Sequence, residues 1–274
     1  MCCFSREVPY VSSTSIFARQ AGPGRQLLAY TMTIEAHEEL AMILPLPVPA
    51  GSPEEAVRFL DLSGYPGLFH DLDRAFPSLI PQAKGGFPVL RSAPAPATLK
   101  VHAVGDFEAS FVPTRADFAR LDPRFRLDDA VWGQLPQYDD HGFAVFQLRG
   151  LEQGWLGRLL GRDRRREFHP MALDFPTREP GRVFFPTVHV HDGRVHPQAD
   201  FDHTLYVQAT GAAPRTCSPD PRSDAHEYWQ AGEPVNDFVR VADTRGLLDG
   251  AGRLYRVGLH GSQPNADRWV SFAG

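Results

Sequence analysis

Four histidines stand close together in the second half of the chain. Residues 189–203 contain four of the 11 histidines of this 274-residue sequence, namely His189, His191, His196 and His203. Neutral imidazole is a ligand for zinc, copper and iron. The cluster therefore predicts a transition-metal site, with these four histidines as candidate ligands and zinc, copper or iron as the candidate cofactor.

The elements around the cluster must bring the imidazoles together. A strand over 183–191 would put His189 and His191 on the same face, because side chains along a strand alternate with a period of two. Asp192-Gly193 has the composition of a hairpin turn. We expect a returning strand after this turn to bring His196 or His203 back toward the pair.

The spacing of the histidine pair resembles the first half of the cupin metal motif. The glutamate of that motif is absent here, and Asp200 and Asp202 are the nearest carboxylates. Cys2, His196 or Asp202 would be a fourth ligand in such a site. The alternative is a structural cluster, in which one histidine pair faces acidic residues across a sheet and the others are exposed on a turn.

A second group with chemical potential lies at the start of the sequence. If Met1 is removed, Cys2 carries a thiol and a free α-amine, which can act together as nucleophile and base. The opening is similar to that of the N-terminal-nucleophile cysteine acylases at Cys2 and at Ile16-Phe17-Ala18-Arg19, where these enzymes have Phe-Gly-Arg on a strand. The resemblance implies an amidohydrolase with Cys2 and Arg19 in its active site, although Gln20-Ala21-Gly22 replaces the family's Asn and Asp.

Several blocks resemble an uncharacterised bacterial family of unknown function. The blocks are the early Cys-Phe, Leu-Ala-Met-Ile-Leu-Pro-Leu-Pro-Val-Pro at 40–49, His-Gly-Phe-Ala-Val-Phe-Gln-Leu at 141–148 and Phe-His-Pro-Met-Ala-Leu-Asp-Phe at 168–175. The resemblance implies that Cys2 and the Leu-Pro-Leu-Pro-Val block serve a shared fold. Members of that family look exported, and no site residue is carried over from them.

The pattern of apolar residues predicts an α+β fold, with a largely antiparallel sheet and short helices inserted. Strands are expected over 8–19, 25–35, 40–48, 99–112 (a hairpin), 142–148, 171–175, 183–191, 205–209, 238–242 and 254–259. Helices are expected over 52–60, 65–76, 114–121 and 128–135. We expect a single domain over 1–274, with the Ala-Pro-rich segment 92–97 as the candidate boundary within it.

Composition excludes several classes of protein. A hydrophobic content of 42% is enough to bury a core, and no apolar run approaches the roughly 20 residues of a membrane helix. The net charge of −5 and the lack of a basic stripe argue against nucleic acid. Three cysteines do not make a disulfide framework. With no signal segment, we expect a cytoplasmic protein whose partner is an unknown small molecule, not nucleic acid or membrane.

Three functions remain open on the sequence alone. The first is a metal-binding protein or metalloenzyme that uses the histidine cluster, and the second is an amidohydrolase that uses Cys2. The third is a non-catalytic binding module, which the lack of a recognisable catalytic triad or phosphate-binding loop favours. The distance between residue 2 and the histidine strand separates these hypotheses.

Overall fold

The structure is a computed structural model that describes residues 2–36, 38–76, 99–105, 107–148, 166–217 and 229–272. Its strands are β1 (Cys2–Phe4), β2 (Tyr10–Gln20), β3 (Arg25–Glu35), β4 (Leu40–Leu46), β5 (Arg58–Asp61), β6 (His102–Val104), β7 (Phe107–Val112), β8 (Gly142–Leu148), β9 (Arg166–Glu167), β10 (Met171–Pro176), β11 (Arg182–Phe185), β12 (His189–Val190), β13 (Gln198–Ala209), β14 (Pro214–Cys217), β15 (Gln230–Ala231), β16 (Arg253–Pro264) and β17 (Arg268–Phe272). Its helices are α1 (Leu68–Arg74), α2 (Asp129–Trp132) and the 3₁₀ helices η1 (Glu54–Ala56), η2 (Arg115–Arg120), η3 (Pro123–Phe125), η4 (Pro136–Tyr138), η5 (Val235–Asp237) and η6 (Val241–Thr244).

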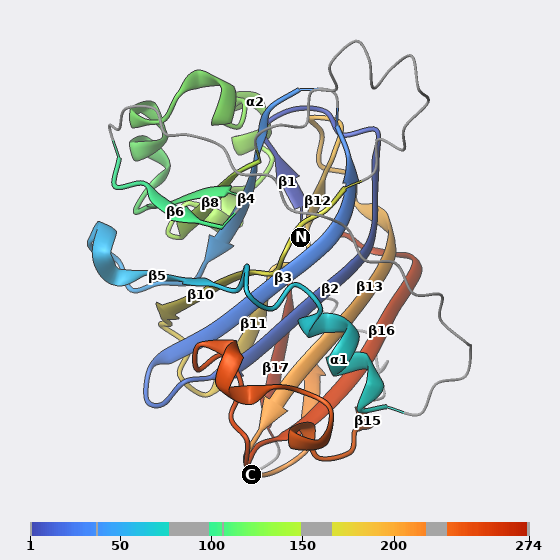
Figure 1. Ribbon diagram of the computed structural model, residues 1–274. Coiled ribbons are helices and arrows are strands. Elements are labelled where there is room, and N and C mark those ends of the chain that lie inside the picture. Colours follow the sequence, from blue (N-terminus) through green and yellow to red (C-terminus); the bar gives the residue numbers. More distant parts are fainter. Residues whose placement is uncertain are drawn as a thin grey trace, which may run out of the picture.

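The described strands form three sheets (Figure 1). A six-stranded sheet has the order β12-β1-β4-β8-β7-β6, and a three-stranded sheet has the order β11-β17-β14. An eight-stranded sheet has the order β15-β16-β13-β2-β3-β10-β5, and β9 pairs with β3 beside this path. Long strands dominate the eight-stranded sheet, and most neighbours in the three sheets are antiparallel. The exceptions are the parallel pairs β1–β12 and β2–β13.

The prediction of an α+β fold is wrong, because the described chain is mostly β. The segment 52–60, expected as a helix, contains the single turn η1 and then enters strand β5. The segment 114–121 is a 3₁₀ helix, and α2 occupies only one turn of 128–135. Helices shorter than about 12 residues are marginal without tertiary packing. These segments therefore connect strands and do not form a helical layer, while α1 within 65–76 is the longest α-helix described.

The expected strands over 8–19 and 25–35 are confirmed, and they form a hairpin. Strands β2 and β3 pair in antiparallel register from Tyr10–Glu35 to Gln20–Gln26, and the register shifts at a bulge between Ser12 and Ser15. Strand β4 lies between β1 and β8, and all seven of its residues are buried. Burial on both faces explains why this segment reads as an unbroken apolar run and does not alternate.

Two expected strands differ in the structure. The segment 183–191 is divided at Pro186 into β11, in the three-stranded sheet, and β12, in the six-stranded sheet. Proline has no N–H for a ladder hydrogen bond, which suits a change of sheet at this point. The segment 238–242 is not a strand, because Thr244 closes a turn there: its hydroxyl donates to the carbonyl oxygen of Val241 at 2.7 Å.

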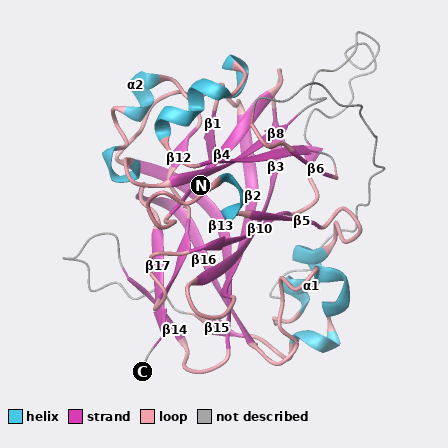
Figure 2. Cartoon of the chain, turned by 90° about the vertical axis from the view of Figure 1, so that its left-hand side faces the viewer, coloured by secondary structure: helices cyan, strands magenta, loops and turns pink. Residues whose placement is uncertain are grey.

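The two large sheets pack face to face over a continuous core. Inward-facing residues of β1, β4, β7 and β8 meet those of β2, β3, β13 and β16 in one hydrophobic cluster. A second cluster covers the opposite face of the eight-stranded sheet, where α1 and the segment 235–248 pack on Phe17, Ala29 and Tyr206. Figure 2 shows most of the helical segments in two groups, one around α2 and one around α1. Because side chains alternate along β13, His203 falls on the side that faces the first cluster.

Among the described residues, no helix is long and apolar enough to cross a membrane. The candidate boundary at 92–97 lies outside the described residues.

Candidate functional site

The candidate site lies where the edge of the six-stranded sheet meets the eight-stranded sheet. His189 begins β12 and pairs in parallel register with Cys2 of β1. His203 lies within β13, in the other sheet, between the inward-facing residues Phe201 and Leu205. The returning strand does bring His203 back to His189, as expected. It does so from a second sheet and not through a hairpin, because β13 pairs with β2 and β16 instead of β12.

Three imidazoles are packed together at this junction. The Nε2 atoms of His189 and His203 lie 3.0 Å apart, and both side chains are buried. The His191 ring stacks on the His189 ring, with centroids 4.9 Å apart and an angle of 17° between the planes. Phe201 lies against His189 with ring centroids 4.4 Å apart, and Phe4 lies 5.7 Å from His191. Aromatic rings thus pack against the histidines, and Asp202 is the carboxylate that approaches His203, with Oδ1 3.6 Å from Nδ1.

Asn265, in the turn between β16 and β17, holds the backbone of His189. Its Oδ1 accepts a hydrogen bond from the His189 amide at 2.6 Å. Its Nδ2 donates to the carbonyl oxygens of His189 at 3.0 Å and His196 at 2.9 Å. The side chain therefore occupies the edge of β12 that β1 does not cover, and it satisfies backbone groups that a neighbouring strand would otherwise pair with.

Asp267, two residues further, fixes the approach to β12. Its Oδ1 accepts from the amides of Thr187 at 2.8 Å and Val188 at 3.2 Å, and its Oδ2 accepts from the Tyr138 hydroxyl at 2.6 Å. Burial raises the pKa of Asp267, and these donors oppose that rise. Asn265 and Asp267 were not predicted from the sequence, because Pro264-Asn265-Ala266-Asp267 has only the composition of a turn.

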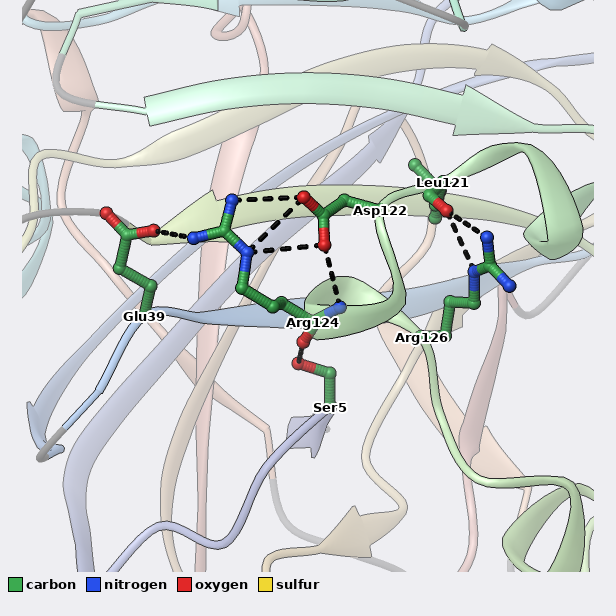
Figure 3. Close-up of polar contacts among 6 residues, drawn as sticks. All are labelled: Ser5, Glu39, Leu121, Asp122, Arg124 and Arg126. Atoms are coloured by element: carbon green, nitrogen blue, oxygen red, sulfur yellow. Dashed lines mark hydrogen bonds and ion pairs between the residues drawn. The ribbon is translucent and has the colours of Figure 1, made fainter. Parts of the chain in front are cut away.

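The chain leaving β1 is tied to the segment before α2 (Figure 3). The Ser5 hydroxyl donates to the carbonyl oxygen of Arg124 at 2.9 Å and accepts from the Ala41 amide at 2.9 Å. The Arg124 guanidinium in turn pairs with Glu39 at 2.8 Å and Asp122 at 3.0 Å. These contacts help to anchor the amino-terminal strand beside His189.

The three clustered histidines are neutral at pH 7. Burial lowers the pKa of His189 far below its ordinary value, and nearby positive charge and the other imidazoles lower it further. Burial also lowers the pKa of His191 and of His203 to about 4 in each case, while Asp202 partly opposes the shift at His203. Each ring therefore carries one N–H and one free lone pair, which is the protonation state that binds a metal ion.

Two of the clustered imidazoles have an unpaired polar atom, and so does Thr14 beside them. Among the described residues, four buried side-chain atoms lack a hydrogen-bond partner: His191 Nε2, His203 Nδ1, Thr14 Oγ1 and Ser110 Oγ. Thr14 is the residue that pairs with His203 in the parallel register of β2 and β13. Buried polar atoms are normally paired, so atoms left without a partner mark a place where a water molecule or an ion can bind.

His196 is not brought to the cluster. Its side chain is 57% exposed, and its Nε2 lies 2.9 Å from Asp192 Oδ2. The turn that carries His196 projects away from the sheet junction, so the residue contacts its own loop.

The structure separates the two residues of the acylase hypothesis. The backbone of Cys2 lies beside His189, whereas Arg19 pairs with Gln208 in the register of β2 and β13. Gln208 is five residues beyond His203 on β13, or about 17 Å at 3.3 Å per residue. The Arg19 guanidinium donates to the carbonyl oxygens of Gln20, Gly246 and Leu247. Arg19 therefore anchors a loop at the far end of the sheet, and a catalytic role for Cys2 stays a prediction.

The cluster is a pair of converging nitrogens with a third ring beside it. Within the described ranges, no group of three or more His, Cys, Asp or Glu residues has the arrangement that holds a metal ion. His189 and His203 direct their Nε2 atoms at each other, and His191 lies parallel to His189. A three-ligand site would therefore require the His191 ring to turn.

Comparisons with known proteins add a loose likeness of overall fold. No protein-family model matches the chain, and no curated protein matches it. The crystal structure of baculovirus P35 has a TM-score of 0.46 at 11% identity, with 97% of each chain covered. A mutated baculovirus P35 after caspase cleavage has a TM-score of 0.49 at 13% identity, covering 96% of this chain and 100% of that chain. A chain of the caspase-8/P35 complex has a TM-score of 0.44 at 11% identity, covering 95% and 96%. Likenesses at this level carry no inference about the function of this chain.

Proposed function

We propose that this protein binds a transition-metal ion at the buried histidine cluster, with His189 and His203 as the first two ligands. The observation that carries the proposal is the 3.0 Å separation of their Nε2 atoms. The two rings come from different sheets, so a shared ion would link β12 to β13. In this role the metal stabilises the junction between the two large sheets.

The separation of the two nitrogens suits one ion. Two tetrahedral ligands at a zinc–nitrogen distance of about 2.0–2.1 Å lie about 3.3 Å apart. The observed 3.0 Å is a few tenths of an ångström shorter, so a small movement of either ring admits a cation. Without a cation, one Nε2 must carry its proton and donate to the other. The metal and the proton are therefore alternative occupants of the same space between the rings.

The chemistry of the ligands selects the class of metal. Imidazole nitrogen suits zinc, copper, nickel and iron, whereas calcium and magnesium require oxygen ligands. The aromatic ring of Phe201 packs against His189. His191 offers a further nitrogen, Nε2, which has no hydrogen-bond partner. His191 is the third ligand in this proposal, after rotation of its stacked ring.

Metal analysis of matched variants tests the proposal. We expect the purified wild-type protein to hold about one equivalent of zinc, copper or iron by elemental analysis. The variants His189→Gln and His203→Gln should each lose it. His196→Gln is the matched control, because His196 belongs to the same sequence cluster but its side chain is exposed and contacts Asp192 of its own loop, not the other histidines.

Metal removal provides a second measurement on the same protein. A ligand that binds only the folded state at 100 times its Kd stabilises that state by about 2.7 kcal/mol. Adding zinc to chelator-treated wild type should therefore raise Tm by several degrees, and adding calcium should not. The proposal is wrong if the wild type is metal-free and no transition metal shifts its Tm. It is also wrong if His189→Gln and His203→Gln retain the metal.

A further inference from the structure

Asp202 lies beside the cluster in an unusual setting. It precedes His203 on β13, on the outward-facing side of the strand, and its side chain is 49% exposed. Its Oδ2 accepts a hydrogen bond from the Ser13 amide at 2.6 Å. Its Oδ1 lies 3.6 Å from Nδ1 of His203, a contact that is slightly longer than a hydrogen bond.

The Ser13 amide reaches Asp202 because β2 is distorted at that point. The register of β2 and β3 shifts between Ser12 and Ser15, and Ser13 has a φ of 52°. A residue other than glycine in this left-handed region costs about 1–2 kcal/mol. The pairing of β2 with β13 begins at the next residue, where Thr14 lies opposite His203. The bulge therefore turns one amide toward the carboxylate at the position where the histidine cluster begins.

The position of the carboxylate bears on which nitrogen of His203 carries the proton. A neutral imidazole has one N–H, and a neighbouring acceptor selects the nitrogen that bears it. Asp202 lies on the Nδ1 side of the ring, whereas His189 lies on the Nε2 side. A proton on Nδ1 leaves the lone pair on Nε2, the atom that faces His189. Carboxylates that hold a metal-binding histidine in this way are worth 10–100-fold in metal affinity.

We infer that Asp202 is a positioning residue that selects the metal-binding tautomer of His203, and that the Ser13 bulge holds the carboxylate in place. The effect of Asp202 on metal affinity rests on the proposed metal-binding function. The tautomer of His203 itself exists without metal. The positioning role differs from the role of a direct ligand, because Asp202 contacts Nδ1 and not the space between the two Nε2 atoms. In this proposal, the 3.6 Å contact between Asp202 Oδ1 and His203 Nδ1 shortens to a hydrogen bond when Nε2 binds an ion.

Nitrogen NMR of the metal-free protein tests the inference directly. With the imidazole nitrogens labelled with ¹⁵N, we expect His203 of the chelator-treated wild type to show a protonated Nδ1 and an unprotonated Nε2 at pH 7.5. In Asp202→Asn the population should move toward protonated Nε2, and Asp202→Glu should restore the wild-type pattern. Asp200→Asn is the matched control, because Asp200 is exposed on the same side of the same strand. A protonated Nε2 in the wild type, or no change in Asp202→Asn, overturns the inference.

Zinc affinity, measured by competition with a chelating dye, tests the consequence. Asp202→Asn should bind zinc 10–100-fold more weakly than wild type, whereas Asp200→Asn should lie within about twofold of it. Equal affinity in wild type and Asp202→Asn overturns the inference even if zinc binds. If the wild type binds no zinc, the proposed function fails, and the tautomer measurement alone decides whether Asp202 positions His203.

Discussion

Strand β13 carries two buried polar residues, five positions apart, that differ in how completely their side chains are hydrogen-bonded. Gln208 is 4% exposed, and its amide makes three hydrogen bonds to the turn at 249–252, at 2.7, 2.8 and 3.0 Å. His203 is 2% exposed, and its Nδ1 has no hydrogen-bond partner while its Nε2 faces another neutral imidazole. One end of the strand is a completed polar network, and the other is an incomplete one.

The same contrast holds for the residues next to them. Beside Gln208, the half-buried Arg19 guanidinium donates to carbonyl oxygens and holds the loop at 246–247. Beside His203, the Thr14 hydroxyl has no partner. Completed networks of buried polar groups specify structure, whereas incomplete ones cost stability unless something else binds. Burial alone therefore does not identify a functional polar residue, and unsatisfied hydrogen-bonding capacity is the better guide.

The largest expected effect is on the pH dependence of stability at the histidine end. His191 and His203 have pKa values of about 4 when folded, below the ordinary value of about 6.5 that they regain on unfolding. Between these values the unfolded chain binds more protons, so stability is full above pH 6.5 and is lost as pH falls toward 4. The free energy of unfolding of chelator-treated protein should fall by up to about 1.4 kcal/mol per pH unit for each such histidine.

Urea denaturation at several pH values measures this slope. His203→Gln should reduce this slope by the contribution of one histidine, up to about 1.4 kcal/mol per pH unit. A wild-type slope that His203→Gln does not alter between pH 6.5 and 4.5 would show that His203 is already protonated or solvated when folded. The contrast between the two ends of β13 would then disappear.

An intermediate effect comes from giving the two residues the same substitution. Gln208→Leu should lower the free energy of unfolding by about 2–4 kcal/mol, because it leaves the amide and carbonyl of Asp249 and the carbonyl of Gly252 without their partner. His203→Leu in metal-free protein should cost less, about 1–2 kcal/mol, because it leaves only His189 Nε2 without its partner. Chemical denaturation of both variants provides the measurement, and Gln198→Ala, at an exposed position of β13, is the control. If both leucine variants lose the same free energy of unfolding, His203 contributes as much to stability as Gln208 does.

The smallest expected effect concerns backbone strain at each end of the sheet. Among the described residues other than glycine, Ser13 and Arg245 have positive φ values, of 52° and 54°. Glycine removes the steric cost but loses more entropy on folding, so Ser13→Gly and Arg245→Gly should each gain at most about 1 kcal/mol. Thermal denaturation and zinc titration check both variants. Ser13→Gly keeps the amide that binds Asp202, so a loss of zinc affinity in this variant alone would mean that the serine side chain contributes to the site.

The local elements of the fold were largely predictable. The turn signal Ala21-Gly22-Pro23-Gly24 between two strand-like segments predicted the β2–β3 hairpin, and the run at 142–148 predicted β8. The lengths of the helices were overestimated, because a capping pattern such as Ser52-Pro53-Glu54-Glu55 indicates where a helix starts but not how long it is. The segment stops after the single turn η1, because β5 pairs with β10 from Arg58 onward. Pairing with a distant strand decides such cases, and local sequence does not contain it.

The candidate site, too, was predictable from the sequence only in part. Composition and spacing determined that several imidazoles lie within 15 residues of chain, and that His189 and His191 can lie side by side. Which histidine returns, His203 and not His196, was decided by the tertiary structure, because β13 enters a different sheet from β12. The protonation state of the cluster, the role of Asn265 in holding His189, and the approach of Ser13 to Asp202 also depend on contacts across long sequence separations. The physical reason is that periodicity along one strand fixes only which face a side chain occupies, whereas burial and the packing of two sheets decide which groups from distant segments share that face.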